Sequence, residues 1–339
     1  MRSFLYTWGK DLAPKIKILE YQRAFRKRRF LPGTYIFSDV ERLTPRESEW
    51  AAGIHNSLRS QWGDDILLLN HPTLSMRRFE LLRVLHQNGT NTHNAFRLIG
   101  GDYPERYPVF IRSADDHAGA TSPLIHSRRA LEKEIERLTR FGKSREDKII
   151  VEFCDTADQD GIYRKYSAFL INETIVPRHV CFSRNWQVKI PDVSNQKLIR
   201  EETEFINSNN HADRLKNIFA TARIQYGRID YGIEDGTIRV WEINTNPRIA
   251  SYISSENPAR HKAQVLFLRL LQQAVERIDG QNKAAGGWVK NPLRKQIMRH
   301  RVRRAAKKIG ESILFALPLT DRQKGIMRAF LVGMKKRWL

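Results

Sequence analysis

The chain has 339 residues, a net charge of +22 at neutral pH and only two cysteines. This length allows a sizeable core with one to three subdomains, and a hydrophobic content of 41% excludes a chain that is disordered as a whole. Cys154 and Cys181 cannot build a disulfide framework or a cysteine metal cluster, and a reduced pair fits the cytosol. No apolar run approaches the roughly 20 residues needed to cross a bilayer, and the first residues lack the apolar core of a signal peptide. We therefore expect a cytoplasmic protein.

The positive charge is concentrated at the two ends of the chain. Residues 1–30 carry nine Lys or Arg and two acidic residues, and residues 281–339 carry sixteen and two. The body is close to neutral, so the charge is expected to serve partners of the ends and not a basic groove through the fold. The expected domains are a basic arm, 1–32, an α/β domain, 33–106, a central region, 107–280, and a basic helical tail, 281–339.

The first 106 residues are expected to form a basic helical arm, 15–30, followed by alternating strands and helices. Thr44-Pro45-Arg46-Glu47 is a strong helix start, with Thr44 as N-cap and Glu47 closing a capping box. The apolar periodicity predicts strands at 35–37 and 66–69 and helices at 44–61 and 75–87. Such an alternation describes a small α/β unit.

The central region begins with a strand, 107–112, and a turn-rich loop, 113–120, that suits closing over phosphates. After this loop, the sequence predicts a β-hairpin together with further helices and one buried strand. In chain order these are a helix at 127–141, a strand at 149–153, hairpin strands at 163–171 and 174–182, and helices at 196–207, 212–222 and 258–279.

One stretch, 227–247, combines two β-rich runs with acidic and amide side chains. Asp230 lies on the first run, and Glu242 and Asn244 lie on the second. These hard oxygen ligands suit Mg²⁺ better than zinc or copper. The stretch is therefore a candidate site for a metal-bound nucleotide.

The turn between the two runs decides whether these residues can cooperate. A two-residue turn at Asp235-Gly236 would pair Glu242 with Ile229 and leave Asp230 and Glu242 on opposite faces. A three-residue loop with Gly236 in the left-handed conformation would pair Arg228 with Glu242 and put both carboxylates on one face. The metal hypothesis therefore predicts the three-residue loop.

This stretch resembles the final hairpin of the ATP-grasp superfamily, in which an Asp and a Glu-x-Asn hold the magnesium ions that bridge the ATP phosphates. The resemblance covers about residues 65–250. It implies an α/β (α+β) ATP-grasp fold with a small N-terminal α/β domain, two lobes within 107–280 that sandwich ATP, and a basic helical C-terminal extension. The implied cofactors are ATP and Mg²⁺, with Asp230, Glu242 and Asn244 as the metal ligands.

The resemblance also implies the nucleotide contacts. Arg112 matches the Lys that the family usually has near the end of this strand, and His117 lies in the loop that follows. The hinge that binds adenine matches Glu152 to Cys154, and Asp155 is the first candidate for the ribose, with Asp158 and Asp160 as competitors. The implied contacts are thus Arg112, His117, Glu152, Phe153, Cys154, Asp155 and Lys165.

The leading hypothesis is an ATP- and Mg²⁺-dependent ligase that forms an acyl phosphate from a carboxylate substrate and couples it to an amine or similar nucleophile. Arg178, as a contact to the γ-phosphate or substrate, and Arg248, beside the metal cluster, are the predicted catalytic cations. One alternative is an ATP-grasp kinase that phosphorylates a hydroxyl of a sugar, inositol or lipid head group. The other is a non-catalytic adaptor for a membrane or nucleic acid.

The tail 288–339 combines basic residues with apolar positions at helical spacing. Basic amphipathic helices suit an anionic membrane surface, so we expect a peripheral contact with the inner face of a membrane. Nucleic acid is a weaker expectation, because aromatic residues for base stacking are scarce among the basic ones. A helical appendage packed on the body would show the same pattern.

Overall fold

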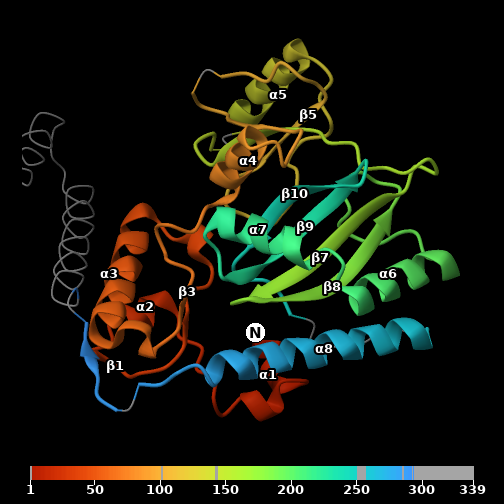
Figure 1. Cartoon of the computed structure of the whole chain (residues 1–339). Helices are drawn as coiled ribbons and strands as arrows, with labels where there is room; N and C mark the ends of the chain where they lie inside the picture. Colours follow the sequence, from red (N-terminus) through yellow and green to blue (C-terminus); the bar gives the residue numbers. More distant parts are fainter. Residues whose placement is uncertain are drawn as a thin grey trace, which may run out of the picture. The chain divides into compact units, whose positions relative to one another are not determined.

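The computed structural model describes residues 2–100, 102–141, 144–249, 257–284, 286–291 and 293 (Figure 1). The chain divides into two compact units, Met1–Ile18 with Leu31–Val289, and Leu19–Phe30 with Lys290–Leu339. Most of the basic tail, 294–339, lies outside the described residues, so its contacts with membrane or nucleic acid stay predictions. None of the helices in the described part of the chain combines the length and the apolar character of a membrane span.

Within residues 19–30 of the smaller unit, the structure has less helix than the arm predicted at 15–30. Its helix α2 (Tyr21–Ala24) ends before the basic run 26–29, where neighbouring like charges disfavour further helical turns. Strand β1 (Arg29–Phe30) follows and pairs with β11 (Val289–Lys290). The same segment is fixed by Asn291, whose backbone N–H donates to the Arg28 carbonyl at 3.1 Å.

The larger unit opens with helix α1 (Arg2–Tyr6) and a 3-10 turn, η1 (Lys10–Leu12). A small α/β part follows, in which β2 (Tyr35–Ile36) pairs in parallel with β3 (Leu68–Leu69). The predicted capping box is present at the start of its helix: Thr44 accepts from the Glu47 N–H, and Glu47 accepts from the Thr44 N–H. The helical segments of this part are η2 (Val40–Arg42), α3 (Pro45–Trp62) and η3 (Gly63–Asp65).

The first large sheet is antiparallel, in the order β4 (Ala95–Arg97), β6 (Lys148–Glu152), β5 (Val109–Ser113). Helix α5 (Arg128–Arg140) covers one face through Leu131 and Ile135, which join Ile111 in one core cluster. Helix α4 (Arg78–Gln87) packs on the other face through Leu82. This lobe therefore includes α4 and β4, which precede the expected domain boundary at residue 107.

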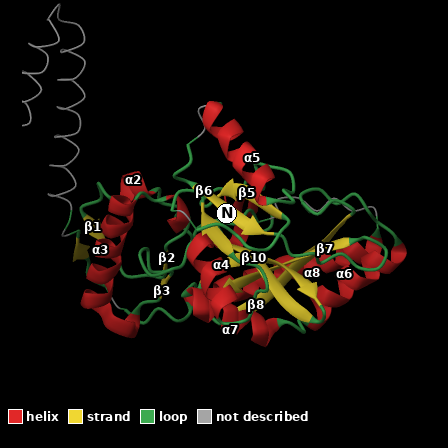
Figure 2. Cartoon of the chain, turned by 90° about the horizontal axis from the view of Figure 1, so that it is seen from above, coloured by secondary structure: helices red, strands yellow, loops and turns green. Residues whose placement is uncertain are grey.

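The second large sheet is antiparallel, in the order β10 (Thr237–Asn244), β9 (Tyr226–Glu234), β7 (Tyr163–Ile171), β8 (Thr174–Ser183). Helices lie on both faces of this sheet (Figures 1 and 2). Alternate side chains of its strands pack on helices of opposite faces. Tyr166 joins a core with α6 (Gln196–Ser208) and α7 (Ala212–Ala222), and Phe169 joins one with α8 (Pro258–Asp279). The predicted α/β (α+β) class is confirmed.

Candidate functional site

The β9–β10 hairpin brings the predicted metal ligands together by a route that the sequence analysis did not foresee. The turn has two residues, Asp235 and Gly236, both with positive φ, so the predicted three-residue loop is wrong. Glu234 pairs with Thr237 as the two-residue alternative requires. A shift of register between Val240 and Glu242 then makes Trp241 the extra residue of a β-bulge.

The bulge restores the pairing that the turn would have prevented. Glu242 lies directly opposite Asp230, and Asn244 lies opposite Arg228. Directly paired residues project from the same face of a sheet, and so do residues two positions apart on one strand. Asp230, Glu242 and Asn244 therefore share a face, as the metal hypothesis requires.

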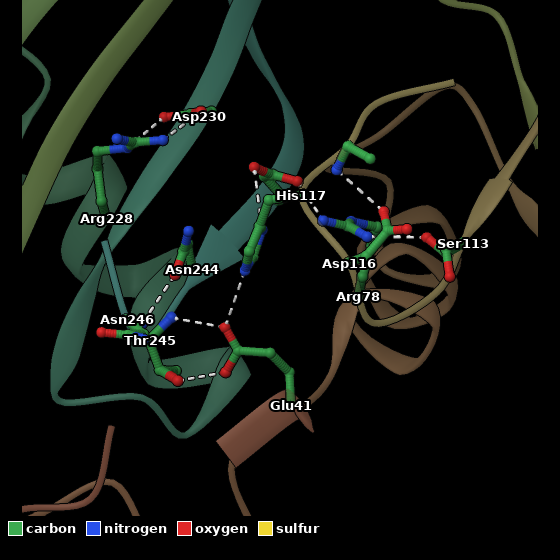
Figure 3. A network of polar contacts seen from close by, with 12 residues as sticks. Glu41, Arg78, Ser113, Asp116, His117, Arg228, Asp230, Asn244, Thr245 and Asn246 are labelled. Atoms are coloured by element: carbon green, nitrogen blue, oxygen red, sulfur yellow. Dashed lines mark hydrogen bonds and ion pairs between the residues drawn. The ribbon is translucent and has the colours of Figure 1, made fainter. Parts of the chain in front are cut away.

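Asp230 is 5% exposed and has its hydrogen bonds satisfied by its own sheet. The Ser167 hydroxyl of β7 donates to it at 2.8 Å. Arg228 donates to its two oxygens from Nε and Nη2 at 2.9 and 3.0 Å (Figure 3). This buried carboxylate is thus neutralised by a two-pronged arginine contact.

Glu242 is surrounded by three cationic side chains. Arg78, at the start of α4, donates Nη2 to its Oε2, and Arg112 of β5 donates Nη2 to the same oxygen at 3.1 Å. His117 Nδ1 lies 3.7 Å from Oε1. Burial alone would raise the pKa of Glu242, but Arg78, His117 and Arg112 together hold it well below its usual range. Glu242 is therefore a carboxylate at neutral pH.

The oxygen atoms of this hairpin fit Mg²⁺ in their chemistry. Two carboxylates stand side by side, and the Asn244 amide oxygen lies on the same face, where it accepts from the Asn246 N–H at 2.7 Å. Hard oxygen donors of this kind are what Mg²⁺ prefers. Within the described residues, no set of three or more His, Cys, Asp or Glu side chains is grouped for a metal ion, and the Asn244 amide is the third oxygen donor on this face beside the two carboxylates.

An open cleft lies between the two large sheets. Its cationic lining comes from Arg112, His117, Lys165 and Lys189. Phe110, Phe153 and Trp186 form an aromatic part, in which Trp186 has its ring centre 5.0 Å from that of Phe110 and 5.8 Å from that of Phe153. A cleft that joins aromatic rings, cations and carboxylates has the surfaces that a nucleotide needs.

Most of the predicted site residues line this cleft. They are Arg112, His117, Glu152, Phe153, Cys154, Lys165, Asp230 and Glu242. Arg112 faces the cleft because it alternates along β5 with Ile111, which packs under α5. Asn244 is buried and is not one of the lining residues.

Three further predicted residues, like Asn244, are not part of the lining. Asp155 is exposed and accepts from the Ala157 N–H at 3.1 Å. Arg248 is exposed after Pro247. The Arg178 guanidinium carbon lies 4.5 Å from the centre of the Phe267 ring, under α8. The roles of these three in nucleotide or substrate binding stay predictions.

The hinge segment after β6 leaves one backbone donor for a ligand. The N–H groups of Glu152 and Phe153 donate to Asn94 and Pro108 carbonyls at 3.0 and 2.9 Å. Within the described residues the N–H of Cys154 has no such partner. The Cys154 thiol donates to Glu234 at 3.4 Å, and burial raises its pKa to about 12, so it is not a nucleophile.

Two buried residues of the site were missed by the sequence analysis. Arg78 donates Nη1 to the Ser113 and Ala114 carbonyls at 2.9 and 2.8 Å, and so links the start of the loop 113–120 to Glu242. Glu41 accepts from the Thr245 N–H at 3.2 Å and lies 3.4 Å from His117 Nε2 (Figure 3). Neither residue stands at a spacing that would have revealed it.

His117 should make stability depend on pH. Its pKa is raised from 6.5 to about 9, chiefly by Glu242 and next by Glu41. Because the folded value is the higher one, this contribution is complete below the ordinary pKa and disappears as pH rises through about 9. We expect the free energy of unfolding, measured in urea between about pH 6 and about pH 9.5, to fall with pH. The fall should be smaller in His117→Gln, and an identical slope would contradict the assignment.

Neither a protein-family model nor a curated protein matches the sequence. Among solved structures, the chain is similar to the D-alanine–D-alanine ligase from Bacillus anthracis complexed with ATP, with 12% identity, 71% of this chain and 78% of that chain covered, and a TM-score of 0.42. The VanG D-Ala:D-Ser ligase from Enterococcus faecalis is 16% identical over 68% of this chain and 70% of that chain, with a TM-score of 0.42. The L-amino acid ligase from Bacillus licheniformis is 14% identical over 72% of this chain and 68% of that chain, with a TM-score of 0.35.

These solved structures are ATP-grasp enzymes, the superfamily that the sequence resembles. Their TM-scores are too low to assign an activity to this chain, which has to be inferred from its own residues.

Proposed function

We propose that the chain is an ATP- and Mg²⁺-dependent ligase of the ATP-grasp type, which activates a carboxylate substrate as an acyl phosphate. The observation that carries the proposal is the position of Glu242 opposite Asp230, in the same cleft as the cations Arg112 and Lys165. A cleft of this composition can hold a triphosphate through cations and a metal through carboxylates.

The adenine ring would lie in the aromatic part of the cleft. Phe153 and Trp186 offer faces and edges for stacking, and the Cys154 N–H offers one hydrogen bond to a ring nitrogen. The triphosphate would then extend toward Arg112 and Lys165. The Lys165 ammonium group has no ion pair or hydrogen bond within the described residues, so it is available for a phosphate.

Asp230, Glu242 and Asn244 would hold Mg²⁺, whose charge would help to neutralise the phosphates during transfer. Arg228 pairs with Asp230, and Arg78, Arg112 and His117 surround Glu242. These cations keep the pKa of Glu242 well below its usual range and hold both carboxylates in place. Preorganisation of this kind lowers the cost of binding a highly charged ligand.

In the proposed reaction, a substrate carboxylate oxygen attacks the γ-phosphorus of ATP and the bond to the β–γ bridging oxygen breaks. The products of this step are an acyl phosphate and ADP. An amine then attacks the acyl carbon, the carbon–oxygen bond to phosphate breaks, and the nitrogen loses a proton to give an amide and inorganic phosphate. The residues of the chain bind, orient and neutralise, and no side-chain nucleophile takes part.

Trapping with hydroxylamine tests this reaction. The full chain would be incubated with Mg²⁺, ATP, hydroxylamine and a panel of carboxylic acids. Carboxylate-dependent formation of a hydroxamate, ADP and phosphate in equal amounts is expected, because hydroxylamine captures an acyl phosphate. A stable phosphate ester of a hydroxyl compound would support the kinase instead. Failure to bind Mg²⁺-ATP in calorimetry would leave only the non-catalytic adaptor.

A further inference from the structure

The N-terminal α/β part contacts the turn that follows β10. The Val40 N–H donates to Thr245 Oγ1 at 3.2 Å. Glu41 accepts from the Thr245 N–H at 3.2 Å and also from the Thr245 hydroxyl. Glu41 is 7% exposed and Thr245 is 2% exposed, so water cannot replace these contacts. The backbone directly after Asn244 is therefore held by residues from a distant part of the chain.

This contact bears on Asn244, one of the proposed metal ligands. Its Oδ1 accepts from the Asn246 N–H at 2.7 Å (Figure 3). An asparagine amide can bind a cation only through its oxygen, and an N–H donor at that oxygen keeps the amide in one orientation. The Asn246 N–H can do this only while the turn 244–246 keeps its shape, which Glu41 fixes at Thr245.

Glu41 also lies close to His117. The Nε2 atom of His117 is 3.4 Å from Glu41 Oε1, and its Nδ1 atom is 3.7 Å from Glu242 Oε1. The imidazole thus stands between the two carboxylates, with one ring nitrogen near each (Figure 3). Glu41 therefore reaches Glu242 through His117. Because it also reaches Asn244 through Thr245, it is connected to two of the three proposed metal ligands.

A charged side chain is a costly means of fixing a buried turn. Burial alone would raise the pKa of Glu41, but His117 and the hydrogen bond with Thr245 hold it below its ordinary value, so Glu41 is ionised at neutral pH. A neutral glutamine could accept the same hydrogen bonds from Thr245 without burying a charge. The charge of Glu41 therefore serves its contact with His117, and not the turn itself.

We propose that Glu41 is a positioning residue for the metal site and that the N-terminal α/β part completes this site. Glu41 fixes the Asn244 amide and the Glu242 carboxylate relative to each other, so that both face the same ion. This inference rests on the proposed function, because it takes Asn244 and Glu242 as ligands of Mg²⁺. Mg²⁺ demands near-ideal octahedral geometry, whereas Ca²⁺ accepts variable geometry. Loss of the positioning contacts should therefore weaken Mg²⁺ binding more than Ca²⁺ binding.

The test measures metal binding by the full chain with one equivalent of a non-hydrolysable ATP analogue. Bound Mn²⁺ is followed by electron paramagnetic resonance and is displaced with Mg²⁺ or with Ca²⁺. Glu41→Gln keeps an acceptor for Thr245 and removes the charge that attracts His117. We expect it to weaken Mg²⁺ binding about 10-fold, as is usual when a residue that orients a metal ligand is changed, and to weaken Ca²⁺ binding by a clearly smaller factor. A mere loss of negative charge would weaken both ions by the same factor.

Thr245→Val is the second variant, because it keeps the charge of Glu41 and removes only the hydroxyl that donates to it. It should shift the preference from Mg²⁺ toward Ca²⁺ in the same direction, which excludes an effect of net charge. Glu47→Gln is the matched control. Glu47 also accepts from a threonine N–H, that of Thr44 at 3.2 Å, but it does so at the start of α3 and is not part of the cleft lining. This control should bind both ions like the unmodified chain.

Urea unfolding of each variant checks that it is folded during the titration. An unchanged ratio of Mg²⁺ to Ca²⁺ affinity in both Glu41→Gln and Thr245→Val would overturn this inference, while the metal site itself would stand. If the unmodified chain held no more Mn²⁺ than the ATP analogue alone, the proposed function would fall first, and this inference would fall with it.

Discussion

A Glu242→Gln variant is expected to lose carboxylate-dependent ADP release by a factor on the order of 100, because the proposed metal and phosphate site loses a full negative charge. The same change should lower the free energy of unfolding by up to about 3 kcal/mol, since it leaves the buried Arg78 without its carboxylate. The side chain of Arg78 is only 4% exposed, so water cannot replace the lost partner. Urea unfolding and ADP release, measured under conditions in which the variant stays folded, would separate the two effects.

Glu80→Gln is the matched control for this prediction. Glu80 also pairs with an arginine, Arg97, at 2.9 Å, but its side chain is 45% exposed and lies away from the cleft lining. Exposed ion pairs contribute less than about 1 kcal/mol, so this variant should keep its stability and its turnover. If Glu242→Gln released ADP as fast as the unmodified chain, Glu242 would not belong to the active site.

Elements with short-range signals could be predicted from the sequence. Thr44 and Glu47 stand at the spacing of a capping box, and the structure has that capping box. The hairpin of β7 and β8 turns at Asn172 and Glu173 as expected, and Asn172 adopts a positive φ that asparagine tolerates well. In both cases the residues that decide the structure lie within a few positions of each other.

The register of the β9–β10 hairpin could not be predicted because it depends on packing across strands. Asp235-Gly236 suits a two-residue turn and a three-residue loop alike, so the turn does not fix the register. The bulge at Trp241 is accommodated by Gly232: a Cβ there would lie 2.8 Å from the Trp241 ring and 3.0 Å from Thr156. Gly232 is needed because its missing side chain leaves room for the Trp241 ring. The alternation of residues along one strand does not reveal such a contact with a neighbouring strand.

The cations around Glu242 could not be predicted for a different reason. Arg78 is 164 residues distant from Glu242, and Glu41 is 204 residues distant from Thr245, its partner. Such contacts arise only when the lobes and the N-terminal α/β part fold together. The candidate metal ligands could be predicted because two strands of one hairpin carry them. The residues that hold these ligands in place could not be predicted, because they are distant in sequence.

Arg78→Met is expected to destabilise the chain by about 3 to 5 kcal/mol, because it leaves an ionised Glu242 short of its most buried partner. The Ser113 and Ala114 carbonyls also lose their donor. The loop 113–120 should therefore exchange its amide hydrogens faster, and affinity for Mg²⁺-ATP should fall with it. Arg83→Met is the control, since Arg83 lies on the same helix but its guanidinium carbon is 6.0 Å from the centre of the Phe96 ring and makes no contact with Glu242.

A double-mutant cycle decides whether this loss comes from the ion pair itself. If Arg78 and Glu242 stabilise each other, Arg78→Met combined with Glu242→Gln should cost less than the sum of the two single changes, by about 1 to 3 kcal/mol. The recovery arises because removal of the charged carboxylate also removes the penalty of burying it without Arg78. Additive losses would mean that Arg78 acts only through the loop carbonyls, and its proposed part in preparing the carboxylate for Mg²⁺ would be withdrawn.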